Sequence, residues 1–129
     1  MNKILIEVSI GELLDKISIL EIKKNKIKNA EKLKFINDEY LILNNQLKQN
    51  VIMNDKLNTL YNKLKEINLK LWDIEDDKRK CEKNSDFGEN FIKLSREVHF
   101  LNDDRAKIKL KINIHTGSKI KEIKEYTKY

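Results

Sequence analysis

The sequence has few of the residues that turn or interrupt a chain. Its 129 residues include 3 glycines and no proline, whereas sandwiches, barrels and dinucleotide-binding folds need such residues at their many turns. This shortage disfavours those fold classes. Long apolar runs are also missing, because nothing approaches the roughly 18 apolar residues that cross a bilayer and residues 4–6 are too short for the core of a signal peptide. The sequence therefore predicts a cytoplasmic protein with no membrane span.

Cysteine and catalytic motifs are equally scarce. The single Cys81 cannot form a disulfide within the chain, which fits a reducing compartment. No zinc-ligand spacing, glycine-rich phosphate loop or nucleophile motif is present. Clustered arginines and stacking aromatics, which nucleic-acid binding favours, are missing as well. These absences disfavour a nucleic-acid partner and a bound cofactor, and they leave enzymatic activity open while favouring its absence.

Charge, by contrast, is abundant. Charged residues make up 37% of the chain, and the net charge is +6. Residues 105–129 hold eight lysines and arginines against two glutamates, so this basic quarter carries the whole net charge. Such a surface favours contact with phosphates or with an acidic partner.

Apolar residues recur at steps of three and four in four segments, which predict helices over 10–28, 30–50, 55–83 and 87–116. A capping residue precedes each helix, and Glu12 and Glu89 stand where they complete capping boxes. The expected caps are Ser9, Asn29, Asn54 or Asp55, and Asp86. Gly117 is placed to end the last helix.

The last two helices predict a long antiparallel hairpin about the turn at 84–88. Their apolar seams meet in register, for example Leu71 with Leu101 and Leu64 with Ile108. We expect the first two helices to pack on this hairpin, which gives an all-α four-helix bundle in a single domain, 1–129. Residues 1–8 are expected to be extended, and residues 118–129 are compatible with a further helical turn or with an extended strap.

The chemistry of a site is indicated by Arg105, which interrupts the apolar seam in mid-bundle. A buried guanidinium needs a carboxylate, and Glu12, Asp15 and Glu21 are the candidates on the first helix. Beside the seam, one flank of helix 55–83 faces one flank of helix 87–116 and predicts a polar groove. The predicted ligand-binding residues are Glu12, Asp15, Lys16, Trp72, Glu75, Arg79, Asn102, Arg105 and Lys109. This groove suits an anionic small molecule (phosphate, nucleotide or nucleotide sugar) or an acidic segment of a partner protein.

Two other functions stay open. In the first, the chain is a coiled-coil-like interaction or oligomerisation protein whose ion pair sets helix register, which is compatible with a homo-oligomer. In the second, carboxylates at spacing three on facing helices hold Mg²⁺ for nucleotide pyrophosphate hydrolysis, as in all-α pyrophosphohydrolases. The metal ligands would then be Glu12, Asp15 and Asp76.

Three stretches resemble an uncharacterised family of small bacterial and phage proteins, described as a domain of unknown function. They are EVSIGELLDKISILEIKKNKI (7–27), LWDIEDDKRKCE (71–82) and NDDRAKIKLKINIHTGSKIKEIKEY (102–126). The matching positions include polar residues that a generic coiled coil would not share: Glu12, Asp15, Lys16, Glu21, Trp72, Glu75, Asp76, Arg79, Asn102, Arg105, Lys109, Asn113, Ser118, Glu122, Lys124 and Tyr126. The resemblance implies no activity.

Overall fold

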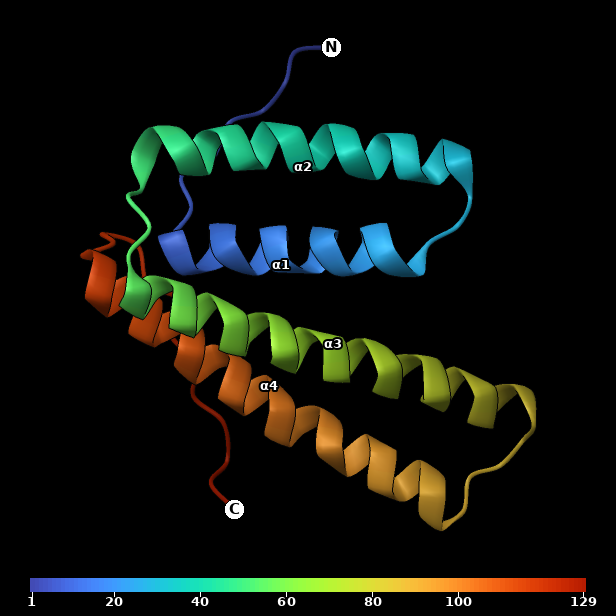
Figure 1. Cartoon of the computed structure of the whole chain (residues 1–129). Helices are drawn as coiled ribbons and strands as arrows, with labels where there is room; N and C mark the ends of the chain where they lie inside the picture. The colour runs from blue at the N-terminus through green and yellow to red at the C-terminus, as the bar shows by residue number, and fades with distance from the viewer.

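Four α-helices make up the regular structure in a computed structural model that describes all residues, 1–129 (Figure 1). They are α1 (Ile10–Lys26), α2 (Ala30–Asn50), α3 (Asp55–Lys83) and α4 (Glu89–Thr116). No strand is present, so the predicted all-α bundle is confirmed. None of the helices combines the length and the apolar composition that crossing a membrane requires.

The helix starts follow from local capping. Side-chain oxygens of Ser9, Asn29 and Asn54 accept hydrogen bonds from backbone N–H groups in the first turns of α1, α2 and α3, at 2.8 to 3.0 Å. At the other end of the chain, Gly117 adopts a left-handed conformation with φ of 66° and ends α4. These four predicted boundaries are confirmed.

The start of α4 differs from the sequence-based expectation. Asp86 does not cap the helix, because its side chain accepts instead from the backbone N–H of Gly88 at 3.2 Å and so closes a short turn. Gly88 is the residue before the helix and offers no side-chain cap, so α4 begins at Glu89, two residues later than predicted.

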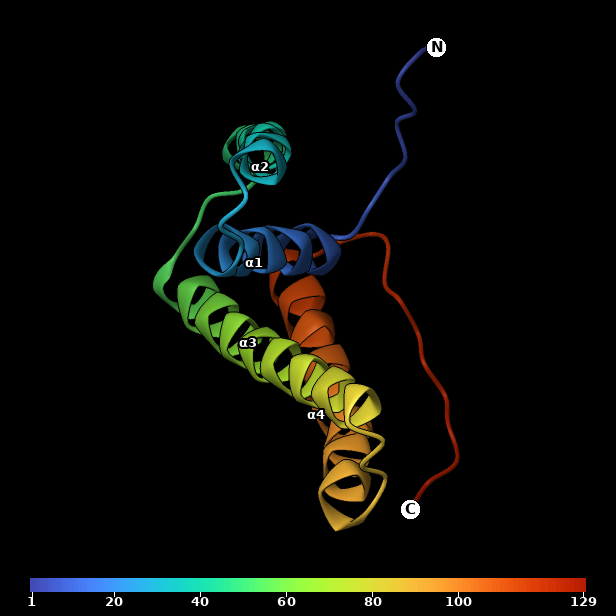
Figure 2. The ribbon, with the colours of Figure 1, turned by 90° about the vertical axis from the view of Figure 1, so that its right-hand side faces the viewer.

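The helices form three layers. α3 and α4 make the predicted antiparallel hairpin, and α1 lies between this hairpin and α2 (Figures 1 and 2). The backbone of α2 approaches α1 alone, so α2 forms an outer layer on α1 and does not flank the hairpin. The turn end of the hairpin projects past α1 (Figure 1).

The main core lies where α1 crosses the hairpin. It contains leucines and isoleucines from all four helices: Leu13, Leu14, Ile17, Leu47, Leu57, Leu60, Leu64, Ile108 and Ile112. A smaller cluster of Ile74, Cys81 and Leu94 fills the projecting end of the hairpin, where Cys81 is buried as an apolar residue. The apolar positions predicted from the spacing of three and four therefore supply most of both clusters.

Neither end of the chain forms regular structure. Residues 1–8 lead away from the helices (Figure 2). The C-terminal segment, residues 118–129, runs back along α4, because Glu122 lies at Lys109 and Tyr129 lies at Asp103 and His99. Of the two open alternatives for this segment, the structure has the strap and not a further helical turn.

α1 and α4 lie close together at Gly11. The backbone N–H of Gly11 donates to Asn113 Oδ1 at 2.7 Å, and the N–H of Ile10 donates to Ser118 Oγ at 3.4 Å. Two N–H groups in the first turn of α1, which have no partner within the helix, are therefore satisfied by Asn113 of α4 and by Ser118 just beyond it. A Cβ atom at Gly11 would lie 2.7 Å from the backbone oxygen of Lys109, so only glycine fits at this crossing.

We predict that Gly11→Ala lowers the free energy of unfolding by about 1 to 3 kcal/mol, because the added methyl group meets backbone atoms that cannot rotate away. Gly88→Ala is the control, since its nearest neighbour would lie at 3.5 Å, an ordinary contact. Urea unfolding of both variants measures the difference. Equal losses at the two positions would contradict the close approach of α1 and α4.

Candidate functional site

A buried carboxylate lies between α1 and the hairpin. Asp15, on α1, is 1% exposed. Its Oδ1 accepts hydrogen bonds from Asn68 Nδ2 of α3 at 2.8 Å and from Arg105 Nε of α4 at 3.0 Å, and its Oδ2 accepts from Arg105 Nη2 at 2.5 Å. Ser18, on the next turn of α1, accepts from the same Asn68 amide at 2.8 Å. One charged group therefore joins three helices.

The electrostatics of this pair follow from its hydrogen bonds. Burial alone would raise the pKa of Asp15, because it disfavours the charged form. The hydrogen bonds from Arg105 and Asn68, together with the charges of Arg105 and Lys109, outweigh burial and hold that pKa below its usual value. The hydrogen bond to Asp15 raises the pKa of Arg105 in turn. The pair is therefore fully ionised at neutral pH.

Lys109 lies one turn beyond Arg105 and gathers the neighbouring carboxylates. Its Nζ is 2.7 Å from Glu12, 3.3 Å from Glu122 and 3.6 Å from Asp15. Burial alone would lower the pKa of Lys109, but these three carboxylates raise it. The charge of Lys109 lowers the pKa of Glu122. Because Glu12 binds Lys109, its carboxylate does not reach back to Ser9, and the predicted capping box forms only its Ser9 half.

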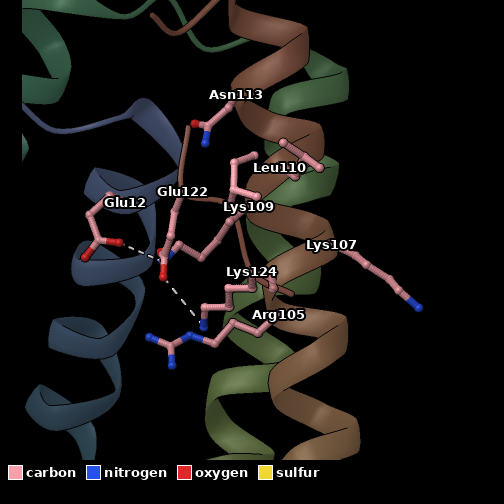
Figure 3. A pocket seen from close by; sticks show the side chains of 10 residues that line it. Glu12, Arg105, Lys107, Lys109, Leu110, Asn113, Glu122 and Lys124 are labelled. Carbon is pink, nitrogen blue, oxygen red and sulfur yellow. Dashed lines mark hydrogen bonds and ion pairs between the residues drawn. The ribbon is translucent and has the colours of Figure 1, made fainter. Parts of the chain in front are cut away.

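Two hollows are lined in part by this network, and a third shares Lys124 with the first of them. The first, which we call the basic hollow, has a volume of about 500 Å³ and lies between α1, α4 and the C-terminal segment (Figure 3). It is lined by Glu12, Arg105, Ala106, Lys107, Lys109, Leu110, Asn113, Glu122, Ile123 and Lys124. The lining thus includes four basic residues and two glutamates, without counting the buried Asp15.

The second, the tryptophan hollow, has a volume of about 400 Å³ and lies between α1 and α3. It is lined by Ile19, Ile22, Asn68, Leu71, Trp72, Glu75, Asp76, Arg79 and Arg105. The third, the tyrosine hollow, has a volume of about 630 Å³ and lies between α4 and the end of the C-terminal segment. Its lining is Val98, His99, Asn102, Asp103, Lys124, Tyr126, Thr127 and Tyr129.

The structure divides the single polar groove that the sequence predicted. Trp72, Glu75 and Arg79 line the tryptophan hollow, whereas Asn102 lines the tyrosine hollow on another side of α4. Two structural features divide the groove. Arg105 turns toward α1 to reach Asp15, and the C-terminal segment covers one flank of α4. Arg105 still connects two parts of the predicted groove, since it lines both the basic and the tryptophan hollows.

Four of the remaining predicted site residues lie together, and the fifth stands apart. Glu12, Asp15, Arg105 and Lys109 come together as one ion network. Lys16 is half-exposed and only approaches Glu12, at 3.8 Å.

Glu21, the third candidate partner of Arg105, does not reach the network. It accepts hydrogen bonds from Tyr61 and Lys65 of α3 instead.

The alternative magnesium ligands do not converge. Asp15 is occupied by Arg105 and Asn68, and Asp76 pairs with Lys80 at 3.3 Å on the exposed face of α3. No group of three or more histidine, cysteine or acidic side chains is close enough to hold a metal ion. Glu12, Asp15 and Asp76 therefore do not form the metal site that the hydrolase alternative would need.

Sequence reasoning missed several residues of the network. Asn68 and Asn113 are buried polar residues beside the seams, and Gly11 is a point of close approach between α1 and α4. Glu122 and Lys124 reach the basic hollow from a segment whose path the sequence left open. None of these residues belongs to an apolar stripe, but Asn113, Glu122 and Lys124 are among the polar positions on which the family resemblance depends.

We predict that Asp15→Asn lowers the free energy of unfolding by about 3 to 5 kcal/mol at pH 7, because it leaves Arg105 charged without its partner. Because folding lowers the pKa of Asp15, its ionisation stabilises the fold fully above the unfolded-state pKa of about 3.9, and this contribution is lost as the pH falls through the folded-state pKa. Below about pH 4, the stability of the parent should thus fall more steeply than that of the variant.

The control for this variant is Asp73→Asn, which removes an exposed carboxylate that pairs with Lys26 at 3.2 Å. It should cost less than about 1 kcal/mol, because exposed ion pairs contribute little. Urea unfolding at several pH values measures both variants. A cost for Asp15→Asn as small as that of Asp73→Asn would contradict the role of Asp15.

Comparison with known proteins places the chain in a family. A model described as a family of unknown function (DUF6165) matches residues 4–129, so the chain belongs to that family. The resemblance drawn from the three sequence stretches is confirmed at this level. No curated protein and no solved structure matches the chain.

Proposed function

We propose that this member of the DUF6165 family binds an anionic small molecule in the basic hollow, and that a phosphate group is the part it recognises. The observation that carries the proposal is the fixed position of Arg105. Its guanidinium is held by two hydrogen bonds from Nε and Nη2 to a carboxylate that is itself buried. A guanidinium oriented in this way is ready to bind an anion without losing further side-chain freedom.

Arg105 keeps unused hydrogen-bond donors. Its two hydrogen bonds to Asp15 use Nε and Nη2, so the hydrogens of Nη1 have no acceptor within the protein. The side chain remains 28% exposed and lines the basic hollow. A purely structural ion pair would not require an open side to the guanidinium, whereas an anion site does.

Two lysines supply further positive charge. Figure 3 shows that the side chains of Arg105, Lys109 and Lys124 gather on the side of α4 that faces α1, whereas Lys107 points away. The carboxylate of Glu122 lies between Lys109 and Lys124, at 3.3 and 3.7 Å. The two lysines therefore already bind one negatively charged group of the protein. A ligand anion could pair with the same lysines by displacing the carboxylate of Glu122.

The chemistry of the hollow favours phosphate compounds over other anions. Phosphate oxygens accept from several donors at once, which suits a guanidinium beside two ammonium groups. The volume of about 500 Å³ lies within the range of small-molecule sites. Phosphate, a nucleotide and a nucleotide sugar all satisfy these conditions, and an acidic segment of a partner protein satisfies the charge alone.

The rival proposal is an interaction protein in which Asp15 and Arg105 only set the position of α1. It is favoured by apolar side chains that stand exposed on the outer layer, Phe35, Leu41 and Ile42 of α2. Such a protein would either bind none of the anions tested below or bind them without using the residues of the basic hollow. The same titrations therefore separate the two proposals.

We predict that Lys124→Gln weakens binding of inorganic pyrophosphate about tenfold, because it removes a charge that points into the basic hollow. Lys107→Gln is the control, since it removes the same charge from the face that points away and should change the dissociation constant less than twofold. Arg105→Lys keeps the charge but loses the planar fork, so it should weaken binding at least tenfold. Isothermal titration calorimetry measures all three, and equal effects of Lys124→Gln and Lys107→Gln would refute the site.

Glu122→Gln should have the opposite effect on binding. The variant loses a carboxylate that competes with the anion for Lys109 and Lys124, so pyrophosphate should bind several-fold more tightly. Glu125→Gln is the matched control, because it removes the same charge from the C-terminal segment at a position that does not line the basic hollow. Tighter binding in both variants to the same degree would indicate a general effect of net charge.

A further inference from the structure

The tyrosine hollow adjoins the basic hollow. Lys124 lines both, so a ligand whose phosphate lies at Lys124 in one hollow has the other hollow within reach. The two hollows have different linings. Charged residues make up most of the first, whereas the second contains two tyrosines, a histidine and an asparagine beside Asp103 and Lys124. This difference suggests that they receive different parts of one molecule.

Aromatic rings form one wall of the tyrosine hollow. Tyr129 packs edge-on against His99 and Phe100 at centroid distances of 5.5 and 5.2 Å, and its hydroxyl donates to Asp103. These contacts hold the end of the C-terminal segment against α4. Tyr126, in contrast, lines the hollow while 72% exposed and has no aromatic partner in the protein.

Polar groups in the same hollow are unused. The Asn102 amide and the imidazole of His99 form no hydrogen bond with other protein groups, although both line the hollow. An amide offers donors and an acceptor, and a neutral imidazole offers one of each. The tyrosine hollow therefore combines an aromatic face with hydrogen-bonding groups, which is the combination that recognises a ring with polar substituents.

We propose that the tyrosine hollow is a ring subsite, and that the ligand is a phosphate compound whose phosphate is joined to a nucleobase-bearing or sugar ring. The phosphate lies in the basic hollow at Lys124 and Arg105, and the ring lies against Tyr126 within reach of Asn102. This inference rests on the proposed function for its phosphate half. Its ring half rests on residues outside the basic hollow, so the two halves can be tested apart.

The experiment compares ligands with and without a ring. Calorimetric titrations of the parent use pyrophosphate against adenosine 5′-diphosphate, and inorganic phosphate against glucose 1-phosphate. We expect at least one ring compound to bind about tenfold more tightly than its ring-free counterpart, which is the effect of one base stacking on an aromatic side chain. The first pair reports a nucleoside and the second a sugar, so the comparison also identifies the source of the ring.

The Tyr126→Ala variant then locates the ring. It should abolish the advantage of the ring compound and leave pyrophosphate binding within twofold of the parent. Phe35→Ala is the control, because it removes an exposed aromatic side chain from α2, far from the hollow, and should leave every dissociation constant unchanged.

The outcomes separate the two proposals. If neither ring-free anion nor ring compound binds, the proposed function itself fails. If pyrophosphate and phosphate bind as tightly as their ring-bearing counterparts, or if the advantage of the ring survives in Tyr126→Ala, the ring subsite is overturned while the anion site stands. Loss of the advantage in Tyr126→Ala alone supports the ring subsite.

Discussion

The arrangement of this protein depends on the neutralisation of one buried charge. Asp15 is almost fully enclosed by α1, α3 and α4, and a carboxylate in that position is tolerated only when each oxygen has donors and a counterion lies beside it. Arg105 and Asn68 supply both. Apolar side chains could pack in several rotations of α1 on the hairpin, but hydrogen bonds have direction, so only one rotation satisfies Asp15. The polar centre thereby selects the packing of the apolar core.

The same constraint produces the candidate site. Because Arg105 must reach across to α1, its guanidinium leaves the interior of the hairpin and stands at the edge of two hollows. Lys109 follows one turn later and draws Glu12 and Glu122 toward it. Stability and the proposed anion binding therefore depend on the same side chains, Arg105 and Lys109, whereas Lys124 and Tyr126 make no contact with Asp15.

The features that the sequence predicts depend on contacts within a few residues, and the features that it misses depend on contacts between distant parts of the chain. The starts of α1, α2 and α3 were predictable because caps and apolar spacing act within a few residues, as Ser9, Asn29 and Asn54 show. The need of Arg105 for a carboxylate was predictable from its seam position, but the choice of Asp15 over Glu12 and Glu21 depends on the rotation of α1, which no local pattern encodes. Asn68 and Asn113 were missed because an isolated asparagine resembles a surface residue in sequence. The division of the predicted groove could not be foreseen, because it depends on the path of the C-terminal segment. That path is set by contacts of single side chains, Glu122 and Tyr129, which leave no periodic pattern in the sequence.

The network has a consequence for the order in which the chain acquires its structure. Asp15 is made 53 residues before Asn68 and 90 residues before Arg105. At a synthesis rate of about 5 to 20 residues per second, this carboxylate waits roughly 5 to 20 s for its counterion. During that time α1 and α2 can pair through their apolar faces, while the polar face of α1 stays hydrated. The counterion that Asp15 needs in its buried position is therefore present only after α4 has been translated.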